Sequence, residues 1–66
     1  MDRTDSERLE ALIDAHGLSL VMAELAEICH GKAEHLATNW QDTRTAKLWS
    51  RDAERIATVS NKLEAA

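Results

Sequence analysis

The chain has 66 residues, no proline, two glycines, one cysteine and a formal net charge of -4. This length allows one small domain, and a composition of 44% hydrophobic and 30% charged residues is typical of a globular chain. The sequence contains no apolar run that could span a membrane and no glycine-rich phosphate loop. Its single cysteine excludes an intrachain disulfide and a cysteine-based zinc site. The charged N-terminal segment does not resemble a signal peptide, and a lone cysteine fits a reducing compartment, so we expect a cytoplasmic protein.

The first expected helix covers about residues 5–16. Thr4 and Glu7 have the spacing of a capping box, in which the two side chains satisfy free backbone N–H groups at the start of a helix. Gly17 supplies the left-handed residue that ends this helix. The apolar side of the helix follows from the 3.6-residue period and comprises Leu9, Leu12, Ile13 and His16.

The second expected helix covers about residues 19–39, with Ser19 as its N-cap. One apolar stripe runs along it, formed by Leu18, Met22, Leu25, Cys29, Leu36 and Trp40. Val21 and Ile28 widen the stripe on one side, and alanines widen it on the other, at Ala23, Ala26, Ala33 and Ala37. An apolar arc this wide exceeds what one neighbour covers. We therefore expect the helix to contact at least two others, one of them closely across the alanines.

The third expected helix covers about residues 43–63 and is capped by Asp42 or Thr43. Its apolar seam consists of Ala46, Trp49, Ala53, Ile56, Ser60 and Leu63. Two long helices joined by a short turn predict an all-α fold built on an antiparallel helical hairpin. A hairpin leaves one apolar side uncovered, and the short first helix can cover only part of it. We therefore expect a homodimer in which two hairpins form a four-helix bundle.

The segment EICHGKAEH, residues 27–35, gathers most of the residues with site chemistry. Its Glu-x-x-His pattern and an i,i+4 histidine–glutamate pair make Glu27, His30 and Glu34 the candidate metal ligands. Because both glutamates lie opposite the leucine stripe and the third helix offers no inward carboxylate, we expect no metal site and no cofactor. Cys29 lies within the apolar stripe, where a thiol stays protonated, so we expect no catalytic residues and no enzyme.

The charges divide between the two ends of the chain. Residues 1–42 hold nine acidic and three basic side chains, whereas residues 43–66 hold three acidic and five basic ones. On the third expected helix the basic side chains share an arc of about 80° opposite the apolar seam. This basic stripe, the candidate partner-binding surface, consists of Arg44, Lys47, Arg51, Arg55 and Lys62. A stripe of this kind is either a solvated face or a contact for an anionic partner.

An acidic protein surface and RNA are the two anionic partners to weigh. We expect Trp40 and Trp49 to pack together at the turn of the hairpin, which leaves no exposed aromatic ring for base stacking. The rest of the chain is acidic and repels phosphate. A protein partner is therefore favoured, and an RNA- or nucleic-acid-binding bundle is the alternative.

Three segments, LIDAHGLSLVMAELAEIC, KAEHLATNWQD and AKLW, resemble short uncharacterised α-helical proteins of bacterial and phage genomes. The resemblance covers roughly residues 9–49 and implies a helical fold and the company of mobile elements, but no activity. Together these observations favour a non-catalytic interaction protein, one form of which is a phage-type inhibitor or regulator of a host protein. A metal-binding bundle ranks third.

Overall fold

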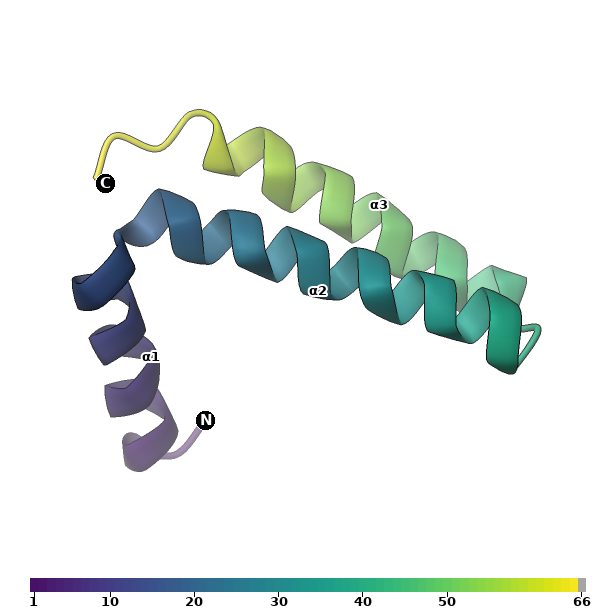
Figure 1. Cartoon of the computed structure of the whole chain (residues 1–66), viewed down its shortest axis with the longest axis horizontal. Helices are drawn as coiled ribbons and strands as arrows, with labels where there is room; N and C mark the ends of the chain where they lie inside the picture. Colours follow the sequence, from purple (N-terminus) through teal and green to yellow (C-terminus); the bar gives the residue numbers. More distant parts are fainter. Residues whose placement is uncertain (66) are drawn as a thin grey trace.

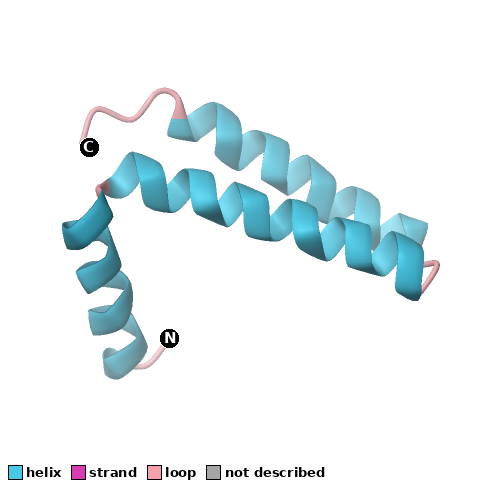
Figure 2. Cartoon of the chain, in the orientation of Figure 1, coloured by secondary structure: helices cyan, strands magenta, loops and turns pink. Residues whose placement is uncertain are grey.

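A computed structural model describes residues 1–65 and contains three helices in that range: α1 (Arg3–His16), α2 (Leu18–Asn39) and α3 (Thr43–Ser60). Everything between and after the helices is turn or irregular chain (Figure 2). The prediction of an all-α fold is therefore confirmed, and α2 and α3 form the expected antiparallel hairpin (Figure 1). None of these helices is both long and apolar enough to cross a bilayer.

The first helix begins two residues earlier than its predicted start. Asp2 is the N-cap, and its carboxylate accepts a hydrogen bond of 2.8 Å from the backbone N–H of Asp5. The prediction of a cap at Thr4 is therefore wrong. The earlier start brings Arg3 into the helix, where its guanidinium lies 3.3 Å from the Glu7 carboxylate one turn later. Asp and Thr are both good N-caps, so the sequence alone did not distinguish them.

Gly17 joins α1 directly to α2. Its backbone has φ 89° and ψ 150°, a conformation that favours glycine, and its N–H donates to the Ile13 carbonyl at 2.7 Å. Gly17 thus ends α1 with a positive φ, as predicted, but its ψ lies outside the left-handed helical region that we expected. The predicted cap at Ser19 is wrong, because α2 starts at Leu18 without any side-chain cap. The chain turns sharply at this one residue, so α1 points away from the hairpin (Figure 1).

A short turn connects α2 to α3. Gln41 takes a positive φ of 52°, and Asp42 caps α3 by accepting a hydrogen bond of 3.1 Å from the Thr45 N–H. Hydrogen bonds from Thr45 hold the pKa of the Asp42 carboxyl below its ordinary value. Of the two caps predicted for α3, the structure thus uses Asp42.

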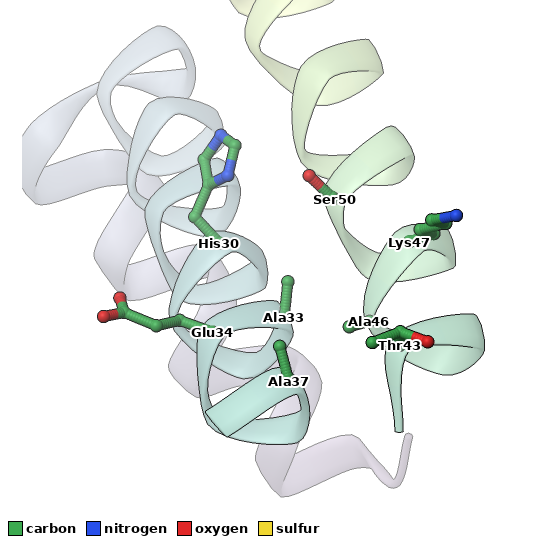
Figure 3. A pocket seen from close by; sticks show the side chains of 8 residues that line it. All are labelled: His30, Ala33, Glu34, Ala37, Thr43, Ala46, Lys47 and Ser50. Carbon is green, nitrogen blue, oxygen red and sulfur yellow. The ribbon is translucent and has the colours of Figure 1, made fainter. Parts of the chain in front are cut away.

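The two long helices meet through small side chains. The Ser60 hydroxyl donates to the Ser19 carbonyl at 3.0 Å, which fixes the register of the antiparallel pair. Steps of two turns from this bond bring Ala53 opposite Ala26 and then Ala46 opposite Ala33. All four alanines are buried, Ala53 completely, and Ala33 and Ala46 face each other between the helices in Figure 3. The close contact predicted across the alanines of the second helix is therefore present at Ala26 and Ala33, whereas Ala23 and Ala37 are exposed.

The molecule is a single layer of helices. Its extents are 37 × 28 × 14 Å, and a helix with side chains is about 10–12 Å across. Its radius of gyration is 13.6 Å, against about 11 Å for a compact chain of this length. No large side chain among residues 1–65 is fully buried. Since domains normally bury their core between two layers, this layer has one apolar side without a cover.

The first helix does not supply that cover. It contacts α2 but not α3, and in the flat view it extends on the side of α2 away from α3 (Figure 1). Leu9 and Ile13 are half-buried against α2, whereas Leu12 stays exposed. Most of the apolar surface of the hairpin thus remains open to water.

Two further expectations are corrected by the structure. The third helix ends at Ser60 instead of residue 63, so Lys62 and Leu63 lie in the turn and irregular chain that follow. Trp40 and Trp49 do not pack together: the register places them about 15 Å apart along the hairpin, and Trp40 is 70% exposed. Trp49 instead lies under Lys32, whose ammonium is 5.4 Å from the centroid of the Trp49 ring.

The alanine seam predicts a size limit at its buried positions. We expect Ala26→Leu to lower the free energy of unfolding by about 1–3 kcal/mol, because the larger side chain forces the two helices apart. Thermal or urea unfolding followed by circular dichroism measures this change. Ala23→Leu is the matched control, since Ala23 is exposed on the same helix. Equal stability of the two variants would contradict the close packing described above.

Candidate functional site

The basic stripe is exposed along its length. Arg44, Lys47, Arg51 and Arg55 all lie on α3 and are exposed, on the side away from α2. Lys62 is also exposed but lies beyond the end of the helix. The structure therefore brings four of the five predicted side chains together on one helical face.

One member of the basic stripe has an acidic neighbour. The Arg55 guanidinium lies 3.4 Å from the Asp52 carboxylate one turn earlier, with the two side chains 75% and 59% exposed. An ion pair this exposed stabilises the helix little, because water screens it and both side chains lose freedom. Arg55 can therefore turn to another carboxylate at little cost.

The structure does not gather the titratable side chains of the EICHGKAEH segment around one point. Within residues 1–65, no group of three or more His, Cys, Asp or Glu side chains converges on a point that could hold an ion. His30 and Glu34 line an open groove on one side of the hairpin, together with Ala37, Lys47 and Ser50 (Figure 3). In that view the Glu34 carboxylate points away from α3, while Lys47 lies on the other helix. Cys29 is half-buried with a free thiol.

A histidine at the end of α2 has a role that the sequence did not reveal. Trp40 donates its indole N–H to Nε2 of His35 at 3.2 Å, and the side-chain amide of Asn39 lies 2.7 Å from Nδ1. Because the indole N–H can only donate, Nε2 must be the acceptor. A neutral ring has one acceptor nitrogen, so Nδ1 carries the hydrogen. The Asn39 atom at 2.7 Å is Nδ2, and a hydrogen bond there requires the flipped amide, which turns the oxygen of Asn39 toward Nδ1. The i,i+4 spacing of His35 and Asn39 was the available signal.

The opposite side of the hairpin is mainly apolar. We define the apolar face by the side chains that α2 and α3 present there: Val21, Leu25, Ile28, Leu36, Trp49 and Ile56. Its middle is a shallow groove where Ile28, Lys32 and Leu36 of α2 lie beside Trp49 of α3. Leu25 is 38% and Ile28 is 48% exposed, and the other four are half-buried. This is a large apolar surface for a chain of this size.

Comparison with known proteins finds no family, no curated protein and no solved structure that matches this chain. The functional argument therefore depends on the surfaces described above.

The His35 bond to Trp40 predicts that removing the imidazole frees the indole. In a Trp49→Phe background, we expect His35→Ala to change the fluorescence of Trp40, whereas His30→Ala on the same helix should leave it unchanged. Equal spectra for His35→Ala and its background would contradict the bond.

Proposed function

We propose that this chain is a non-catalytic protein–protein interaction module that acts as a homodimer. Two copies stack through their apolar faces into a four-helix bundle, and the bundle presents the basic stripes to an acidic surface on another protein. One form of this function is a phage-type inhibitor or regulator of a host protein. A free, half-buried thiol at Cys29 suits a reducing compartment such as the cytoplasm.

The observation that carries the dimer is the uncovered apolar face of a one-layer molecule. The chain exposes 5341 Å², whereas a compact monomer of 7.4 kDa exposes roughly 4,200 Å². The excess of about 1,100 Å² is similar to the roughly 800 Å² that each partner loses in a standard protein interface. A second copy stacked on the apolar face supplies the missing layer and removes this excess.

The observation that supports an anionic partner is the separation of charge. The basic stripe projects from α3 away from α2, so stacking through the apolar face leaves Arg44, Lys47 and Arg51 in water. The exposed acidic side chains of α2, at Glu24, Glu27 and Glu34, occupy a different part of the surface. A row of four exposed cations on one helix attracts an acidic surface and accelerates encounter with it.

A second candidate function, RNA or other nucleic acid binding, is favoured by Trp40. We expected this ring to be buried, yet it is 70% exposed and lies at the same end of the hairpin as Arg44. An exposed indole near basic side chains is a surface on which a base can stack. The net charge of -4 opposes this function, so it ranks second.

The proposed dimer predicts different effects for two similar substitutions. Wild-type protein at micromolar concentration should scatter light as a dimer, and Ile28→Glu should give a monomer because it places a carboxylate in the apolar face. Leu20→Glu is the matched control, since Leu20 is 63% exposed and points away from this face. A wild-type monomer of 7.4 kDa would refute the dimer.

The basic stripe predicts how partner binding depends on charge. Wild-type protein used as bait in native cell extract should retain an acidic protein that Lys47→Glu plus Arg51→Glu loses. The control, Arg3→Glu plus Arg8→Glu, changes the same charge on α1 and should retain it. Binding of a short RNA that weakens steeply with salt would support the second candidate instead. If the double variant of α3 retains every partner, the stripe is only a solvated face.

A further inference from the structure

The apolar face carries two charged residues of opposite sign. At about 100° per residue, Lys32 of α2 lies between Leu25 and Ile28 around its helix, and Asp52 of α3 borders Ile56. The Lys32 ammonium lies over the Trp49 ring and has no carboxylate within ion-pair distance among residues 1–65. Asp52 is held only by the exposed contact with Arg55.

Stacking a second copy on this face takes Lys32 out of water. A buried ammonium is costly unless a carboxylate neutralises it. The part of α2 that faces outward here, from Val21 to Leu36, offers apolar side chains and Lys32 but no acid, since its glutamates lie elsewhere on the helix. The acid on the apolar face is Asp52 of α3. Lys32 therefore gains a partner only if α3 of the second copy lies across α2.

A two-fold symmetric pair of hairpins can stack in two ways. If the two-fold axis runs across the helices, α2 of one copy lies on α2 of the other, and α3 lies on α3 of the other. With the axis parallel to the helices, α2 lies on α3 of the other copy. We propose, on the basis of the dimer proposed above, that the second copy binds in this second arrangement, with both turns at the same end of the bundle. Lys32 and Asp52 of the second copy then differ in height by about 7 Å, which a lysine side chain spans.

The edges of the apolar face support the same arrangement. Glu24 follows Ser19 by five residues, and Arg55 precedes Ser60 by five, so the Ser60–Ser19 bond places them at the same height in the hairpin. Each side chain is exposed and stands two residues from a seam alanine, so it points about 160° away from the seam, at the outer edge of its helix. An axis parallel to the helices keeps heights unchanged, so Glu24 of each copy meets Arg55 of the other. The other arrangement gathers the glutamates along one edge and the arginines along the opposite edge, where like charges repel.

A charge exchange tests the arrangement. In the proposed dimer, Glu24→Arg homodimers place arginine against arginine twice, and Arg55→Glu homodimers place glutamate against glutamate twice. Each variant alone should dimerise roughly 5- to 20-fold more weakly than wild type. An equimolar mixture restores two opposite-charge contacts, so native mass spectrometry should show more heterodimer than random pairing gives, with near wild-type affinity.

The matched control is the pair Glu34→Arg and Lys47→Glu. These residues lie on the same two helices but line the groove on the opposite side of the hairpin, so the same charge changes there should leave their mixture to pair at random. Far-ultraviolet circular dichroism confirms that each variant is helical. If wild type is a dimer and the Glu24/Arg55 mixture pairs at random, the arrangement is wrong and the proposed dimer stands. If wild type is a monomer, both are wrong.

Discussion

The close contact of α2 with α3 through alanine and serine determines the rest of this molecule. Ser19, Ala26 and Ala33 recur every seven residues on one helix, and Ala46, Ala53 and Ser60 do so on the other. Side chains this small let two helix axes approach, but they bury little apolar area per residue. No leucine, isoleucine or tryptophan among residues 1–65 is buried between the helices. A hairpin joined in this way has a well-defined helix register but buries few large apolar side chains.

The hydrophobic pattern predicted this architecture because local spacing decides most of it. Three apolar stripes, a glycine at position 17 and an aspartate at position 42 place the helices and the turn within a few residues. The pattern could not distinguish Asp2 from Thr4 as the first cap, since both side chains accept the same kind of hydrogen bond. It also could not place Trp40. A tryptophan on an apolar stripe is expected inside, but this one lies at the helix end, where no second helix reaches it.

The candidate surfaces were predictable to the extent that they follow from one helix. The basic stripe depends only on residue spacing along α3, so four of its members lie where the sequence placed them, and Lys62 does not because the helix stops at Ser60. The register between helices was not predictable, because it depends on which small side chains meet. Without the register, the sequence does not reveal that Glu24 and Arg55 lie at equal heights, or that Lys32 has no carboxylate within ion-pair distance among residues 1–65.

The alanine seam and the apolar face have different roles, and this difference explains why the apolar face can carry charged residues. If Lys32 and Asp52 were leucines, the hairpin would bury more apolar area in a dimer, but either stacking arrangement would be equally acceptable. A buried lysine that needs an acid on one specific helix penalises the wrong arrangement more than it stabilises the right one. Core alanines define the register within a copy, and in the dimer that we propose opposite charges define the register between copies. Arg44, Lys47 and Arg51 of the basic stripe lie outside both contacts, so these side chains are free to vary with the partner without disturbing either one, whereas Arg55 belongs to the contact proposed between copies.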